Sequence, residues 1–269
     1  MNYRHAYHAG NHTEVFKHAV LVRLIAALQA KEKPLFVLDT HAGAGLYDLE
    51  ATEARKTNEA DAGIRAVEGD ASETLKPYLD LVRGFGGKYP GSPSLIAKLL
   101  RSQDRAALCE LHEEDFGRLR RLFLNNAQVA LHRRDGYEAM MAFVPPLERR
   151  GLIFTDPPYE ATDEMQTLAT SLIAAHAKWP TGVYAAWYPI KDRRQARALK
   201  DALRERFIPD VLAVEFLRYP IDGERLAGSG MVVINPPWNL DDWLNTLCAD
   251  LANAFGAGEG AVEWVTQPT

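Results

Sequence analysis

The chain has 269 residues, of which 47% are apolar and 25% are charged, and its formal net charge at pH 7 is −5. This composition is typical of a globular protein with one large domain, or one domain with an insert. It excludes a membrane-spanning protein, because no apolar run approaches the ~18 residues of a span, and the net charge by itself argues against a nucleic-acid binder. The two cysteines, Cys109 and Cys248, lie far apart in sequence, and the N-terminus does not resemble a secretory signal, so we expect a reducing, cytoplasmic location.

The N-terminal segment, residues 4–20, carries four of the eight histidines. Asn11 followed by Glu14 is typical of a capping box, which predicts that a helix begins after His8. No HExxH pattern and no cysteine lies near these histidines, so we expect no metal site. We therefore assign His8 and His12 a structural role.

Short apolar segments recur along the rest of the chain. Each has the length of a strand and is continuously apolar rather than alternating, which is typical of strands buried on both faces. The segments are 35–39, 106–110, 128–131, 151–156, 182–187, 211–216 and 230–235. Helical stripes lie between them, at 21–28, 95–100 and 116–123, and Ser92 followed by Pro93 predicts a helix N-cap. The alternation predicts an α/β fold with a mostly parallel sheet and helices on both sides.

The connection between residues 46 and 105 is too long for one crossover helix. We therefore predict a small helical subdomain at 48–91, inserted into a main domain of residues 1–47 and 92–269. Residues 48–75 hold eight acids against three bases, whereas residues 191–206 hold seven bases against three acids. The basic run could bind a polyanion or could be a solvated helix surface, and the sequence leaves both open.

A glycine turn follows the first predicted strand, in the segment VLDTHAGAG at 37–45. Such a turn lets the backbone approach a ligand at the carboxyl edge of a sheet, although the third glycine of the dinucleotide fingerprint is absent. A ribose-binding acid is expected roughly 20 residues further on. Glu110 lies 65 residues after Gly45, and removing the 44-residue insert leaves 21. The spacing indicates a cofactor that contains a nucleoside.

The segment DPPY, residues 156–159, follows the strand GLIFT. Proline has no N–H and fixes φ, so a backbone carbonyl near Pro157 is held beside the Asp156 carboxylate. Two fixed acceptors suit a planar aromatic amine, because accepting both hydrogens localises the nitrogen lone pair for attack on an electrophile. Tyr159 offers a flat face for an unstacked base.

These motifs resemble motif IV of S-adenosylmethionine-dependent methyltransferases that act on adenine N6. More narrowly, the chain is similar to the ribosomal RNA large subunit methyltransferase J family in YRHAYHAGNH, LDTHAGAG, YPGSP, ELH, RDGY and DPPY. The resemblance covers most of the chain. It implies a Rossmann-like class I methyltransferase fold with a seven-strand, mostly parallel sheet, S-adenosylmethionine as cofactor, and an adenine of 23S ribosomal RNA free of ribosomal proteins as the substrate of a monomeric enzyme.

The resemblance also implies roles for individual residues. The cofactor contacts would be His18, His41, Gly43, Ser92, Glu110, Asp135, Gly136 and Asp156. The catalytic residues would be Asp156, Pro157 and Tyr159, with Asp156 as proton acceptor. The substrate contacts would be Tyr3, His5, Lys17 and Tyr159.

A second segment, NPPW at 235–238, is similar to DPPY. In the implied fold it ends an antiparallel strand that points away from the cofactor, so we assign it a structural role and expect Trp238 to pack on a helix.

The alternative functions are adenine-N6 methylation of DNA, amide methylation of glutamine, a non-catalytic RNA-binding module and an NAD-dependent enzyme. We expect the loop at 222–230 to be mobile.

Overall fold

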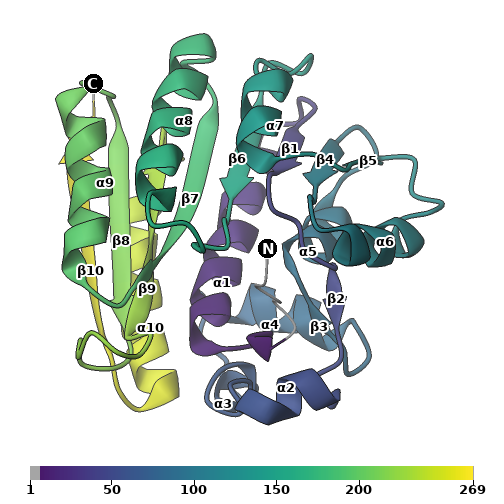
Figure 1. Cartoon of the computed structure of the whole chain (residues 1–269), viewed down its shortest axis with the longest axis vertical. Coiled ribbons are helices and arrows are strands. Elements are labelled where there is room, and N and C mark those ends of the chain that lie inside the picture. The colour runs from purple at the N-terminus through teal and green to yellow at the C-terminus, as the bar shows by residue number, and fades with distance from the viewer. Residues whose placement is uncertain (1–6, 269) are drawn as a thin grey trace.

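The computed structural model describes residues 7–268 (Figure 1). Its main sheet has eight strands in the order β10-β8-β9-β7-β6-β1-β4-β5. The strands are β1 (Phe36–Asp39), β4 (Arg105–Cys109), β5 (Val129–His132), β6 (Gly151–Thr155), β7 (Val183–Ile190), β8 (Val211–Leu217), β9 (Gly228–Ile234) and β10 (Glu259–Thr266). The five strands from β5 to β7 are parallel, whereas β9 pairs antiparallel with both β7 and β8.

The sheet has one strand more than the seven expected. The additional strand, β10, pairs antiparallel with β8 at the edge of the sheet. Two glutamates interrupt its sequence EGAVEWVT and most of its residues are exposed or half-buried, so it lacks the continuous apolar run by which the other strands are recognised.

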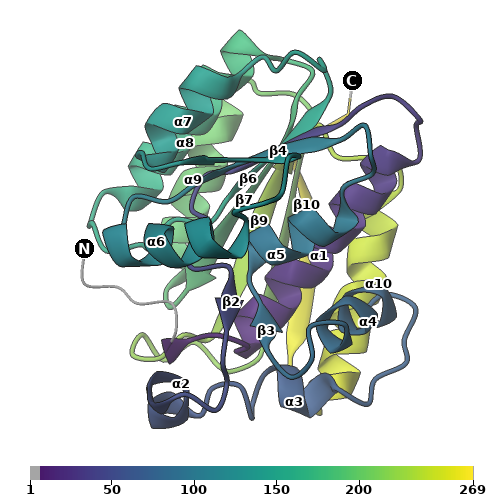
Figure 2. The same cartoon turned by 90° about the vertical axis from the view of Figure 1, so that its right-hand side faces the viewer.

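Helices cover both faces of the sheet, as the alternation of strands and helices predicts (Figure 2). One face packs against α7 (Gly136–Phe143), α8 (Glu164–Lys178) and α9 (Arg193–Glu205), and the other against α1 (His12–Gln29), α5 (Ser92–Leu99), α6 (Glu113–Leu122) and α10 (Leu240–Phe255). In β6, Leu152 and Phe154 face the α1 side whereas Ile153 faces the α8 side. This alternation explains why the strand is apolar at every position.

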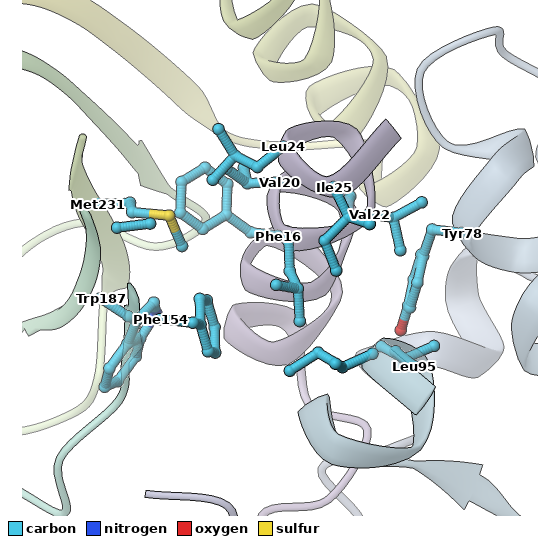
Figure 3. Packing of buried hydrophobic residues seen from close by; sticks show 14 of the residues in the cluster. Phe16, Val20, Val22, Leu24, Ile25, Tyr78, Leu95, Phe154, Trp187 and Met231 are labelled. Carbon is cyan, nitrogen blue, oxygen red and sulfur yellow. The ribbon is translucent and has the colours of Figure 1, made fainter. Parts of the chain in front are cut away.

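The side chains in the first half of helix α1 are buried around its whole circumference. Its side chains contact Phe154, Trp187 and Met231 of the sheet on one side and lie toward Tyr78 and Leu95 on the other (Figure 3). A helix that is apolar around most of its circumference belongs in a core, and α1 fills the space between the sheet and the segment that follows β1. The cap is as predicted: the Asn11 side chain accepts from the Glu14 N–H at 2.9 Å.

The segment at 48–91 contains three short helices, α2 (Thr52–Thr57), α3 (Ile64–Val67) and α4 (Lys76–Arg83). The two-stranded ladder of β2 (Leu46–Tyr47) and β3 (Tyr89–Pro90) closes it at its base. Helix α4 contacts α1, α3 contacts α10, and their apolar side chains join the same core. The segment lies at the carboxyl end of the parallel strands (Figure 1). Its division from the rest of the chain as a subdomain stays a prediction.

Two local predictions are wrong. Helix α5 has Gly91 as its N-cap rather than Ser92, whose hydroxyl instead donates to Asp39. The segment at 222–230 is a loop only as far as Ala227, because β9 begins at Gly228. The loop between β8 and β9 is therefore shorter than expected, and the Ala227 N–H closes it onto Ile190 O at 3.0 Å.

Candidate active site

A cavity of about 860 Å³ opens at the carboxyl edge of the parallel strands. The segments that follow β1, β4, β5 and β6 line it, together with the first turns of α1. All the predicted site residues that the structure describes lie in its lining: Lys17, His18, His41, Gly43, Ser92, Glu110, Asp135, Gly136, Asp156, Pro157 and Tyr159. The remaining two, Tyr3 and His5, lie outside the described residues. The position and size of the cavity are those of a ligand site in an α/β protein.

The glycine turn after β1 is joined to the acid after β4. Gly43 has φ +63°, a conformation that favours glycine, and its N–H donates to Glu110 Oε2 at 2.8 Å. The His112 N–H donates to Glu110 Oε1 at 2.7 Å. Burial raises the pKa of Glu110, and these two N–H groups partly offset that effect. The plane of the carboxylate is thus fixed at the cavity wall.

Asp39, the last residue of β1, is a functional candidate that the sequence analysis missed. It is fully buried, and its Oδ2 accepts from Ser92 Oγ at 2.6 Å while Oδ1 accepts from the His41 N–H at 3.3 Å. Burial raises the pKa of Asp39 to about 7, the Ser92 hydrogen bond opposes the shift, and the charge of Asp156 adds to it. The sequence does contain a signal for this residue, because Asp39 is an acid at the end of the apolar run LFVLD.

Asp135 caps α7 at the next strand end. Its Oδ1 accepts from the N–H groups of Tyr137 and Glu138, at 2.9 and 3.0 Å. A Cβ on Gly136 would lie 2.4 Å from Thr40 O, so this glycine allows α7 to approach the turn after β1.

His41 packs edge-on against the Tyr137 ring, with the ring centroids 5.3 Å apart. Burial lowers the pKa of His41, which keeps its ring neutral near pH 7. The ring therefore offers a hydrogen-bonding group without a charge beside the cavity.

Lys17 forms an ion pair with Asp156, although the sequence analysis placed it toward the substrate. Its Nζ also lies 2.7 Å from Glu14 Oε1 and over the Trp187 ring, 5.4 Å from the centroid. Lys17 is 3% and Glu14 is 2% exposed. Burial alone would lower the pKa of Lys17, but the two carboxylates outweigh burial and raise it. Lys17 is thus a permanent cation that holds Asp156 from the α1 side.

His18 connects the cavity to the segment at 48–91. Its Nδ1 lies 3.0 Å from the Tyr89 hydroxyl, which lies 3.0 Å from the Tyr78 hydroxyl. All three side chains are buried. The ring of His18 is therefore fixed by β3 and α4, so this segment shapes the cavity wall.

Tyr159 ends the DPPY segment in an unusual backbone conformation. Its φ is +53°, which is rare for a residue with a side chain. The hydroxyl donates to Trp187 O, and the ring lies edge-on to the Trp187 ring with the centroids 5.8 Å apart. Burial raises the pKa of Tyr159. The anchored ring forms a rigid wall of the cavity beside Asp156, and strained backbone of this kind occurs often at functional sites.

NPPW lies at the opposite edge of the sheet. The Asn235 amide donates to Pro180 O at 2.8 Å and to Gly182 O at 2.7 Å, next to the start of β7. These bonds give the segment the structural role that we predicted. The expected packing of Trp238 is wrong, because this side chain is 90% exposed.

Two histidines of the N-terminal segment, His8 and His12, have partners within the protein. His8 bonds Glu59 at 3.0 Å, and His12 lies edge-on to Tyr219 with the ring centroids 5.3 Å apart. Burial lowers the pKa of His12 to about 4, and the charge of Arg218 adds to that shift. Within residues 7–268, no group of three or more His, Cys, Asp or Glu side chains could hold a metal ion. In the same range, no helix is both long and apolar enough to cross a membrane.

The strand order, the antiparallel β9 and the glycine turn after β1 define a Rossmann-like fold of the class I methyltransferase type. Residues 32–266 match the family "Ribosomal RNA large subunit methyltransferase D, RlmJ", and the chain belongs to this family.

Two relatives named "Ribosomal RNA large subunit methyltransferase J" match nearly the whole chain. The protein from Haemophilus influenzae is 38% identical over 278 residues and covers 99% of both chains. The protein from Escherichia coli K12 is 37% identical over 276 residues and covers 98% of this chain and 99% of its own. The crystal structure of protein LPL1258 from Legionella pneumophila superposes with a TM-score of 0.89 at 34% identity, covering 95% of this chain and 98% of that one.

Proposed function

We propose that this protein transfers a methyl group from S-adenosylmethionine to N6 of an adenine in 23S ribosomal RNA. The observation that carries the proposal is the position of Asp156 and Pro157 in one cavity with Gly43 and Glu110. The fixed Glu110 carboxylate suits a nucleoside, and the pair at 156–157 suits a planar amine. The names of the curated relatives, ribosomal RNA large subunit methyltransferases, support the class of substrate.

The residues of the cavity fit the proposed cofactor. Each Glu110 oxygen is held by one backbone N–H, and each keeps a second lone pair for one of two neighbouring ribose hydroxyls. Asp135 is oriented through Oδ1, so Oδ2 can accept from the adenine amine of the cofactor. When bound, S-adenosylmethionine supplies an electrophilic methyl group. The residues that would hold it are His18, His41, Gly43, Ser92, Glu110, Asp135, Gly136 and Asp156.

In the proposed reaction, Asp156 and the Pro157 carbonyl accept the two hydrogens of the target amine. This arrangement localises the lone pair on N6 and points it into the cavity, a preorganised electrostatic effect. Lys17 holds Asp156 in place, since its Nζ contacts the Asp156 carboxylate directly. Asp156 or a water molecule then takes the proton that the methylated nitrogen loses. Tyr159 and Trp187 provide aromatic walls for the base.

The proposed substrate follows from the cost of reaching N6. An adenine must leave its stack to enter the cavity, at a cost of a few kcal/mol that is smaller in single-stranded or loop RNA. We therefore propose that the enzyme acts on 23S rRNA before ribosomal proteins cover the target. We also propose that it acts as a monomer. Tyr3 and His5, which lie outside the described residues, remain proposed substrate contacts, together with Lys17 and Tyr159.

Competition between acceptors tests the proposal. Purified protein is incubated with tritium-labelled S-adenosylmethionine and protein-free 23S rRNA, alone or with an excess of unlabelled adenine-rich DNA. We expect label in RNA that DNA does not suppress. Label that moves to DNA would favour the DNA methyltransferase, and cofactor binding without any turnover would favour a non-catalytic RNA-binding module.

A further inference from the structure

The cavity extends past Asp156 to a rim that the proposed chemistry does not use. On this side it is lined by Lys191 and Gln195, where β7 passes into α9, and by Tyr219 and Arg225 of the β8–β9 loop. Most of the proposed cofactor residues follow β1, β4 and β5, and Asp156 follows β6, which lies between these strands and β7 in the sheet. The rim at 191–225 is therefore the side from which a methyl acceptor would enter.

Arg225 is held at this rim by contacts on two sides. Asp222 Oδ1 accepts from its backbone N–H at 3.1 Å, and Asp222 Oδ2 contacts its Nε at 3.0 Å. The guanidinium lies over the Tyr219 ring, 4.7 Å from the centroid. Tyr219 in turn packs edge-on against His12 of α1. The Asp222 contact uses Nε, so the two terminal nitrogens remain available for another acceptor, and the stacking fixes the plane in which they lie.

Lys191 adds a second cation to the same rim. It is exposed, it follows directly on β7, and it forms no ion pair among the residues that the structure describes. Most other cations of the basic run form ion pairs. Arg194 pairs with Asp192, and Lys200 pairs with Glu215 and Glu263. The cavity lining includes only the beginning of this basic run, because α9 leads away from the cavity.

We propose that Lys191 and Arg225 bind the backbone phosphates that flank the target adenine. The inference rests on the proposed function. A nucleotide that enters base-first stays connected to the RNA chain through two phosphates, and these must remain at the rim of the cavity. Two cations at that rim, one of them a planar group with paired donors, match this need. Tyr219 is a positioning residue that holds the guanidinium of Arg225.

Substrate kinetics of single variants test this inference. Arg225→Gln and Lys191→Gln are compared with the control Arg206→Gln, which replaces an exposed arginine at the far end of α9. Methylation of protein-free 23S rRNA is measured at several salt concentrations, and cofactor binding is measured by calorimetry. We expect each rim variant to raise the KM for RNA roughly 5- to 20-fold, the loss of one ionic hydrogen bond at a partly exposed site. Cofactor affinity and kcat should stay unchanged.

Two further readouts separate phosphate binding from a structural role. The dependence of log affinity on log salt should become shallower by about 0.7 for each lost phosphate contact on a single strand. Arg225→Lys should restore part of the affinity, and Tyr219→Phe should keep it whereas Tyr219→Leu should not. Wild-type turnover with unchanged KM and salt dependence in both rim variants would overturn this inference alone. Absence of turnover in the wild type would overturn the proposed function, and this inference with it.

Discussion

Replacing Lys17 by methionine tests the buried ion pair on which the site depends. The substitution keeps the volume of the side chain but leaves Glu14 and Asp156 without their shared cation. Glu14 is 2% exposed and the Asp156 side chain 13%, so water can compensate little. Breaking a buried pair by removing one partner costs about 3–5 kcal/mol, a large share of a total stability of roughly 5–15 kcal/mol.

The partner substitution should cost less. Asp156→Asn leaves Lys17 paired with Glu14 at 2.7 Å, so we expect a loss of about 1–3 kcal/mol. Because both changes remove the same contact, the double variant should be less destabilised than the sum of the two single variants. The control is Lys98→Met, an exposed lysine in α5, which should stay within about 0.5 kcal/mol of the wild type.

Urea unfolding at pH 7, followed by far-ultraviolet circular dichroism, gives these free energies directly. Equal slopes against urea are required for the comparison, because a changed slope would indicate a change in the unfolded state. A Lys17→Met variant within about 1 kcal/mol of the wild type would contradict the reasoning. Strict additivity of the two substitutions would contradict it as well, since it would mean that the two side chains do not interact.

Three further predictions follow from the cavity wall. Burial raises the pKa of Asp39 to about 7 from an ordinary 3.8. Between about pH 4 and pH 7 the folded protein therefore holds a proton that the unfolded chain has released. Because of this difference, Asp39 makes the stability of the protein fall as pH rises through that range. Asp39→Asn should therefore gain stability over the wild type from pH 5 to pH 8 in urea titrations, and a pH-independent difference would argue against it. Gly136→Ala should cost about 1–3 kcal/mol because its Cβ meets Thr40 O at 2.4 Å, whereas Gly117→Ala, with nothing nearer than 3.9 Å, should gain about 0.5–1 kcal/mol. Glu110→Gln should weaken S-adenosylmethionine binding in calorimetry by roughly 10-fold, the value of one charged hydrogen bond, and unchanged affinity would remove Glu110 from the cofactor site.

Most of the fold could be predicted because burial leaves a direct trace in the sequence. A strand covered on both faces must be apolar at consecutive positions, as LFVLD at 35–39 and GLIFT at 151–155 are. The edge strand β10 shows where this signal ends, since most of its residues are exposed or half-buried. Trp238 shows another limit, because an aromatic residue carries no information about which neighbours are present to bury it.

The site could be predicted to the extent that its residues follow strands. Parallel strands end at one edge of a sheet, so Gly43, Glu110 and Asp156 had to lie close together once the sheet was assigned. The ion pair of Lys17 with Asp156 could not be predicted in the same way. The two residues are 139 positions apart, and only the packing of α1 against the end of β6 brings them together.

Mass spectrometry of nucleosides tests the central claim most directly. Protein-free 23S rRNA is incubated with the purified protein and S-adenosylmethionine that carries a deuterated methyl group, and the RNA is then digested to nucleosides. The account predicts labelled N6-methyladenosine with the wild type and almost none with Asp156→Ala, a variant that keeps the other proposed cofactor contacts. Label on another nucleoside, or undiminished N6-methyladenosine with Asp156→Ala, would contradict the assignment of this carboxylate as the group that orients the target amine.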